Sequence, residues 1–112
     1  MKRPLLAGLL ALALSAPTAS AQAPSGQMTA RTTAYCLNGR TAMGTYVRPG
    51  VVAVDPHVIQ MGSRLTIEGL DGVYVAEDTG GGVIGNWVDV YFPNCSEAVQ
   101  WGVQYRNVEW FP

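Results

Sequence analysis

Short segments in which apolar and polar residues alternate make up most of the chain after residue 27. Such alternation is typical of β-strands that bury one face. The glycines and prolines that mark turns fall mainly between these segments. The pattern predicts six strands, at 28–36, 51–54, 64–68, 73–77, 87–92 and 103–111.

The long connection before the second strand and the end of that strand are both marked by proline. Residues 37–50 end in Pro49 and Gly50 and are predicted to form a loop. Pro56 has no N–H for a strand ladder and disfavours helix for the residue before it. The second strand should therefore stop at Asp55, which leaves this carboxylate at the end of the strand.

Two further connections complete the predicted architecture. Residues 69–72 fit the turn of a hairpin, and residues 96–101 fit a short helix that begins at Asn94 or Ser96 and ends at Gly102. Six short strands with one short helix near the C-terminus predict a small all-β barrel. Closing a barrel also removes exposed strand edges.

The first residues have the pattern of an export signal peptide. Lys2 and Arg3 provide a positive start, residues 5–14 an apolar segment, and residues 19–21 a small-residue cleavage site. This apolar segment is too short to be a membrane-spanning helix, which needs about 20 apolar residues. We therefore expect residues 1–21 to be removed as a signal peptide and no part of the chain to insert in a membrane. The expected location is outside the cytoplasm, secreted or in the periplasm.

Cleavage after Ala21 would leave 91 residues, which suffice for one small domain. We expect residues 22–27 to be a linker and residues 28–112 to form this domain, as a monomer. Five arginines then stand against eight acidic residues, a net charge of −3. This balance excludes nucleic acid as a partner, since such binding needs a clustered basic face.

Cys36 and Cys95 are the two cysteines of the chain. In an exported protein they predict a disulfide, which closes a loop of about 60 residues and stabilises the domain by roughly 3–4 kcal/mol. The alternative is a nucleophilic cysteine, which needs a histidine partner. His57 is the one histidine, and no motif pairs it with either cysteine.

The strand at 87–92 carries an acid between two valines. Side chains alternate along a strand, so Trp87, Asp89 and Tyr91 share one face, and the aliphatic residues between them are predicted to be buried. An acid between two aromatic rings suits a carbohydrate, because rings stack on sugar faces while a carboxylate reaches the glycosidic oxygen. An ordinary solvated strand face explains the pattern equally well.

The other acids have plain structural interpretations when each is taken alone. Asp78, in the sequence Asp-Thr-Gly, fits a turn that accepts backbone N–H groups, and Asp55 before proline is also a turn former. Asp71 fits a turn, and the four glutamates fit solvated positions, namely Glu68, Glu77, Glu97 and Glu109.

Three other site types can be weighed on the same residues. Glycines 80–82 lack the lysine and hydroxyl that follow in a phosphate-binding loop. Asp-Thr-Gly also occurs in aspartic proteases, but the charged Glu77 precedes it here. Carboxylates suit hard cations, yet the spacing of Asp55, His57, Asp78 and Asp89 fits no known metal loop, so we expect no metal or cofactor.

Taken together, the motifs resemble the 3D (three-aspartate) domain family over about residues 30–110. The similar segments are 34–36, 41–44, 50–56, 59–65, 75–81, 84–92 and 98–102. Gln60 stands where the family usually has proline, and the turn at 82–85 lacks the usual lysine.

The resemblance implies a double-psi β-barrel related to the catalytic domain of membrane-bound lytic transglycosylase A and to stationary-phase survival proteins. Its three aspartates correspond to Asp55, Asp78 and Asp89. Asp89 matches the catalytic acid, Asp78 a supporting site residue and Asp55 the third member of the cluster. The substrate-binding residues it implies are Tyr35, Thr41, Thr79, Gly80, Trp87 and Tyr91.

The implied function is a peptidoglycan lytic transglycosylase. A single Asp89 would act first as acid and then as base, with a pKa raised by apolar surroundings and by ionised Asp78 or Asp55. A two-acid glycoside hydrolase is one alternative. A non-catalytic, expansin-like module that binds cell-wall glycan is the other.

Overall fold

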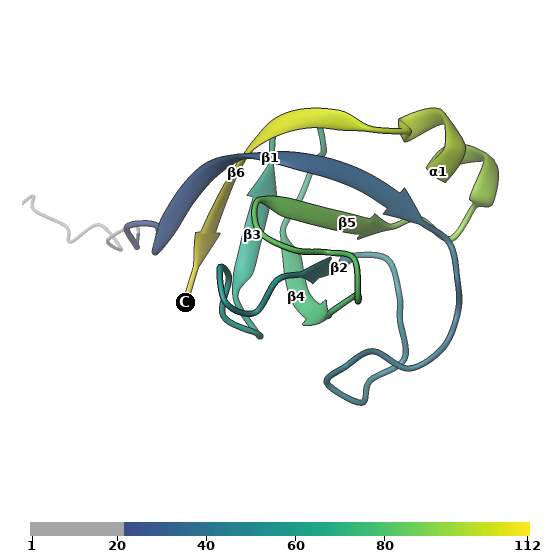
Figure 1. The fold of residues 1–112 in the computed structure, drawn as a ribbon, viewed down its shortest axis with the longest axis horizontal. Helices are drawn as coiled ribbons and strands as arrows, with labels where there is room; N and C mark the ends of the chain where they lie inside the picture. The colour runs from purple at the N-terminus through teal and green to yellow at the C-terminus, as the bar shows by residue number, and fades with distance from the viewer. Residues whose placement is uncertain (1–21) are drawn as a thin grey trace, which may run out of the picture.

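The two longest strands form a curved antiparallel ribbon that runs across the barrel (Figure 1). They are β1 (Gly26–Tyr35) and β6 (Gln104–Phe111) in a computed structural model that describes residues 22–112. The predicted signal peptide, residues 1–21, lies outside the described residues. Strand β1 begins at Gly26, two residues earlier than predicted, because residues 26 and 27 already pair with the end of β6. The predicted linker is shorter by those two residues.

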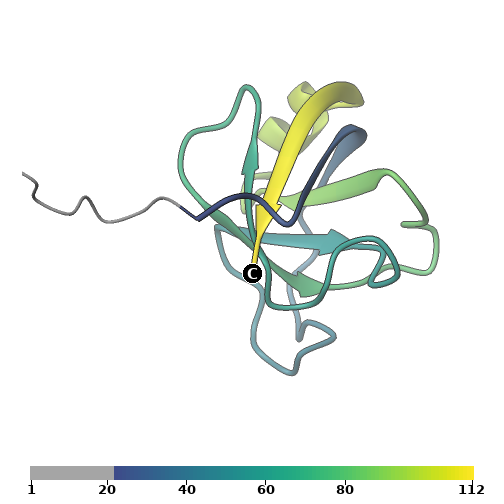
Figure 2. The same ribbon diagram turned by 90° about the vertical axis from the view of Figure 1, so that its left-hand side faces the viewer.

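The remaining strands are short and close the barrel. They are β2 (Val51–Val54), β3 (Arg64–Ile67), β4 (Tyr74–Asp78) and β5 (Trp87–Tyr91). The strand order is β1-β5-β2-β4-β3-β6 in a closed ring, with β1/β5 and β2/β4 parallel and the other pairs antiparallel (Figure 2). The predicted six-stranded barrel is therefore confirmed, and β3 and β4 form the predicted hairpin.

One short helix, α1 (Cys95–Trp101), precedes β6, as the sequence predicted. Asn94 is its N-cap: the side-chain oxygen accepts hydrogen bonds from the N–H groups of Ser96 at 2.9 Å and Glu97 at 3.2 Å. Gly102 ends the helix with a positive φ of 62°, which favours glycine. Within residues 22–112, no helix has the length and apolar character needed to cross a membrane.

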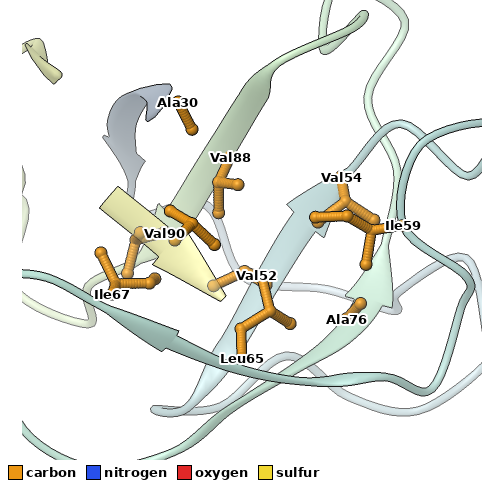
Figure 3. Packing of buried hydrophobic residues seen from close by; sticks show 10 residues of the cluster. Ala30, Val52, Val54, Ile59, Leu65, Ile67, Ala76, Val88 and Val90 are labelled. Atoms are coloured by element: carbon orange, nitrogen blue, oxygen red, sulfur yellow. The ribbon is translucent and has the colours of Figure 1, made fainter. Parts of the chain in front are cut away.

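The inward residues of every strand meet in one core, which Figure 3 shows from close by. Val52 and Val54 of β2 face Val88 and Val90 of β5, and all four are fully buried. Branched side chains of this kind fit the pleated surface of a strand. The other members of the cluster are Ala30, Ile59, Leu65, Ile67, Ala76 and Val108.

A disulfide joins Cys36 and Cys95, as predicted. It connects the residue that follows β1 with the first residue of α1, and the two Cα atoms are 5.2 Å apart. The bond therefore fixes both the start of the 37–50 loop and the helix to the same end of the barrel (Figure 1).

Reduction of this disulfide is expected to lower the free energy of unfolding by about 4 kcal/mol, because a closed loop of 59 residues restricts the unfolded chain. Urea unfolding with and without reductant measures the difference. The Cys36→Ser/Cys95→Ser variant is the control, since reductant should leave its midpoint unchanged. Equal midpoints for the oxidised and reduced wild type would contradict the prediction.

Candidate functional site

Asp78 and Asp89 lie on either side of one small residue of β2. Ala53 pairs with Asp89 of β5 on one side and with Asp78 of β4 on the other. Partners in adjacent strands are about 4.8 Å apart and point to the same face. The two acids therefore share the outer face of the barrel, separated by the width of one strand that carries only a methyl group there.

An open groove with a volume of about 270 Å³ lies over these two acids. One side of the groove is formed by the 37–50 loop and the other by the strand ends. Its lining residues are Tyr35, Leu37, Asn38, Gly39, Arg40, Val47, Asp78, Thr79 and Asp89.

Tyr35 lines the groove and contacts one of the two acids. It is the last residue of β1, and its hydroxyl donates to Asp78 Oδ2 on β4 at 3.3 Å. Burial raises the pKa of the Tyr35 hydroxyl, and the negative charges of Asp78 and Asp89 raise it further. Tyr35 is therefore a neutral hydrogen-bond donor at neutral pH.

Asp89 is half-buried, and one of its oxygens is held in place. Thr33 donates its hydroxyl proton to Asp89 Oδ1 at 2.7 Å, and Trp87 Nε1 donates to the same Thr33 oxygen at 2.8 Å. Burial raises the pKa of the Asp89 carboxyl; the Thr33 hydrogen bond opposes this rise, and the charge of Asp78 adds to it. Within residues 22–112, Oδ2 makes no protein hydrogen bond, so it is available to carry a proton.

Asp78 has a different environment, because both of its oxygens accept hydrogen bonds. Oδ1 accepts from the N–H groups of Ala42 at 3.0 Å and Thr79 at 2.9 Å, and Oδ2 accepts from Tyr35. The carboxylate thus fixes the 37–50 loop and the following turn to the end of β4. These bonds confirm that Asp78 accepts backbone N–H groups; its supporting role beside Asp89 stays a prediction.

Asp55 does not line the groove. Its Oδ2 accepts from Gly85 N at 2.8 Å and its Oδ1 from His57 N at 2.9 Å. These backbone bonds, that of Gly85 first, lower the pKa of Asp55. The carboxylate ties the glycine-rich turn before β5 to the end of β2. The neighbour that raises the pKa of Asp89 is therefore Asp78, not Asp55.

The aromatic residues beside Asp89 are less open than the sequence indicated. Tyr91 is only 6% exposed, because Asn38 of the 37–50 loop lies over it and accepts its hydroxyl proton at 2.7 Å. The Arg31 guanidinium lies over the Trp87 ring, with its central carbon 4.2 Å from the ring centroid. The expectation of two free rings beside the acid is wrong for Tyr91, while Trp87 is partly exposed.

The three small residues implied at the site have separate places. Thr79 lines the groove. Thr41 is buried, with its hydroxyl 2.8 Å from that of Thr45, so it shapes the loop from within. Gly80 packs against Val83, whose Cγ2 would lie 2.9 Å from a side-chain carbon at position 80.

The interpretation of Glu77 as a solvated residue is wrong. Glu77 is 8% exposed and accepts hydrogen bonds from both Arg48 guanidinium nitrogens, at 2.8 and 2.7 Å, and from the Thr45 hydroxyl at 2.7 Å. The Arg48 hydrogen bonds, followed by that of Thr45, lower the pKa of Glu77 to about 2. The ion pair attaches the second half of the 37–50 loop to β4.

Sequence reasoning missed Thr33, which donates to Asp89, and Arg40, which lines the groove. Thr33 is a threonine in a strand and carries no motif of its own. Arg40 lines the groove with a guanidinium that also donates to Gly44 O and stacks on Tyr46. Arg40 thus adds a positive charge to the groove. The turn at 82–85 lacks the lysine that is usual in the family. The position of Arg40 beside Asn38-Gly39 in a predicted loop was the one available signal.

Two of the alternative chemistries receive no support from this geometry. Both cysteines are in the disulfide, so neither supplies a thiolate. Among residues 22–112, no three side chains of the metal-binding types His, Cys, Asp and Glu are grouped to hold an ion. His57 contacts Asp55, with its ring Nδ1 at 3.0 Å from Oδ1, outside the groove.

Replacing Thr33 with valine is expected to raise the pKa of Asp89 further, because the hydroxyl hydrogen bond that lowers it is lost. Carbon-13 NMR titration of the aspartate carboxyls measures the shift. Thr33→Ser keeps the hydroxyl and should keep the wild-type value. An unchanged or lower Asp89 pKa in Thr33→Val would show that the hydrogen bond does not act on this carboxyl.

Acid is expected to destabilise the protein through Glu77. Its pKa in the folded state, about 2, lies below the ordinary value of 4.5, so the stabilisation is present above pH 4.5 and is lost as the pH falls toward 2. Glu77→Gln should lower stability at pH 7 and flatten the decline between these pH values in urea unfolding. Glu97→Gln, at an exposed helix position, should decline like the wild type; a parallel decline in Glu77→Gln would contradict the prediction.

Comparison with known proteins gives two bacterial relatives. The chain is 40% identical over 97 residues to the Bacillus subtilis "Cell wall-binding protein YocH", covering 79% of this chain and 33% of the relative. It is 42% identical over 84 residues to the B. subtilis "Putative cell wall shaping protein YabE", covering 67% of this chain and 20% of the relative. The chain thus spans about a third and a fifth of their lengths.

Solved structures share the barrel. MltA from E. coli superimposes with a TM-score of 0.55 at 25% identity, covering 64% of this chain and 27% of MltA. The Streptomyces papain inhibitor superimposes with a TM-score of 0.59 at 16% identity, covering 80% of this chain and 97% of the inhibitor, which shows the fold alone. The model of the 3D domain matches residues 50–111. The chain is a double-psi β-barrel and belongs to the 3D domain family.

Proposed function

We propose that this domain acts on peptidoglycan outside the cytoplasm, as a lytic transglycosylase that cuts the β-1,4 bond between N-acetylmuramic acid and N-acetylglucosamine. The 3D family, the cell-wall names of YocH and YabE, and the barrel shared with the lytic transglycosylase MltA support a peptidoglycan-related role. The disulfide agrees with an oxidising compartment.

The observation that carries the catalytic part of the proposal is the asymmetry of the Asp89 carboxyl. Oδ1 accepts the hydrogen bond from Thr33, while Oδ2 accepts none within residues 22–112. The residue lines an open groove, and burial raises the pKa of the carboxyl group. A general acid needs a proton that it holds near the working pH and a direction in which to deliver it. The raised pKa of Asp89 and its free Oδ2 atom support this role.

The reaction needs one acid in two successive roles. Protonated Asp89 donates its proton to the glycosidic oxygen as the bond from that oxygen to the anomeric carbon breaks. The 6-hydroxyl of the same muramic acid then attacks the anomeric carbon, and the Asp89 carboxylate takes the hydroxyl proton. The products are a shortened strand and a 1,6-anhydro end; no water is consumed, and Asp89 is protonated again.

The occupied oxygens of Asp78 favour this single-acid route over a hydrolase. A glycoside hydrolase uses two working carboxyl groups, one as acid and one as base or nucleophile. Asp78 accepts three hydrogen bonds and anchors two backbone segments, so it is committed to holding the loop. Its role in the reaction is electrostatic: its charge helps keep the proton on Asp89.

A second candidate is a module that binds cell-wall glycan without cutting it. The printed name of YocH, a cell wall-binding protein, favours this candidate. In such a module Arg40, Thr79 and the acids of the groove would hydrogen-bond the glycan, and Asp89 would transfer no proton.

Incubation with purified sacculi tests the catalytic proposal. The wild type should release muropeptides with anhydro ends, identified by mass, and Asp89→Asn should release them at least about a hundredfold more slowly, because general acid–base catalysis is lost. Asp71→Asn changes an exposed turn acid by the same substitution and should keep wild-type activity.

Each other product pattern points to a different function. Reducing ends in place of anhydro ends would establish a hydrolase. Sacculus binding by the wild type without any release would establish the binding module. Equal release by Asp89→Asn and the wild type would remove Asp89 from the mechanism.

A further inference from the structure

A second hollow on the surface is larger than the groove at Asp89. It has a volume of about 540 Å³ and lies on the outer face of β1, β6 and β3. Its polar lining consists of six outward side chains from these three strands: Gln27, Thr29, Thr66, Glu68, Asn107 and Glu109.

These six side chains form two parallel rows across the strands. Gln27 pairs with Glu109, which pairs with Thr66. One step along, Thr29 pairs with Asn107, whose carbonyl accepts a hydrogen bond from the N–H of Glu68. The core residues of the same strands point inward. The side chains that the strands present to the hollow are therefore the hydrogen-bonding groups of these two rows.

The row of Gln27, Glu109 and Thr66 has unused hydrogen-bonding capacity. In the other row, Thr29 donates to Asn107 and Glu68 accepts from the Asn107 N–H, so those side chains are already partly hydrogen-bonded. Within residues 22–112, the side chains of Gln27, Thr66 and Glu109 make no hydrogen bond. None of the residues that line the hollow is basic, and two are glutamates. The hollow therefore disfavours anions and suits a neutral ligand rich in hydroxyl and amide groups.

A third row connects this hollow with the groove. Arg31 pairs with Trp87 on one side and Tyr105 on the other, and Tyr105 is 68% exposed. The next row toward the groove is Thr33 with Asp89. From Thr33 to Gln27 is six residues along β1, or about 20 Å at 3.3 Å per residue. This distance is longer than a single disaccharide.

We propose that the hollow is a distal binding site for the same glycan strand that occupies the groove at Asp89. The strand would run along the outer face of β1 and over Tyr105, and its hydroxyl and N-acetyl groups would bond to Gln27, Thr66 and Glu109. This inference rests on the proposed function for the class of ligand. It adds the direction of the strand on the barrel and a preference for long strands.

Chito-oligosaccharides from the disaccharide to the hexasaccharide, added to the intact protein, test the inference by calorimetry and NMR. The longest ligand should bind about tenfold more tightly than the disaccharide, which two further hydrogen bonds can supply. Amide signals of Gln27 and Glu109 should shift only with the longer ligands. The Gln27→Ala/Glu109→Gln variant should lose the gain with length and keep its affinity for the disaccharide.

Glu97→Gln is the matched control, because it removes one exposed negative charge on α1, far from the rows, and should behave as the wild type. Equal affinity for short and long ligands, or an unchanged gain in the double variant, would overturn the distal site alone. Absence of binding at every length would overturn the proposed ligand class as well. Binding of oligolysine in the hollow, with no oligosaccharide there, would assign it to a cationic peptide and overturn the inference.

Discussion

Burial of the valines of β2 and β5 is the constraint on which the site depends. The interior of the barrel holds these four valines of two adjacent, paired strands: Val52, Val54, Val88 and Val90. Side chains alternate along a strand, so a slip of one residue would turn these valines outward and the acids inward. The hydrophobic core therefore determines that Asp89 faces out beside Ala53. On the other side of Ala53, a register shift in the β2/β4 pairing places Asp78 opposite Ala53, although Ala76, two residues earlier, is in the core.

Four acids of similar chemistry are separated in function by the donors around them. Glu77 has a guanidinium and a hydroxyl, Asp55 and Asp78 have backbone N–H groups, and Asp89 has one threonine hydroxyl. Donors stabilise the ionised form, and burial opposes it. Asp89 has only one donor, and burial raises the pKa of its carboxyl group, whereas the donors around Asp55 and Glu77 lower theirs.

The strands, the helix and the disulfide could be predicted because each leaves a local signal. Alternation indicates the buried face, and Asn94 and Gly102 mark the helix ends. Two cysteines in a chain with a predicted export signal favour a disulfide. The resemblance to the 3D family also carried the closed barrel, which local patterns alone do not specify.

The side-chain partners of the site could not be predicted in the same way. Glu77 meets Arg48, 29 residues earlier, and Trp87 meets Thr33, 54 residues earlier. Such contacts arise from barrel closure and leave no trace in the spacing of either residue. Tyr91 illustrates the same limit, since the alternation placed it outward correctly but could not reveal that Asn38 covers it.

The 37–50 loop is attached to the barrel at its start and again between residues 42 and 48. The disulfide fixes its beginning, and Glu77 and Asp78 hold Arg48, Thr45 and Ala42. Leu37 and Arg40 lie between these attachments and line the groove, as does Val47. Residues 37–40 can therefore be redesigned to accept other polymers, while the acids, the core and the ion pair stay as they are.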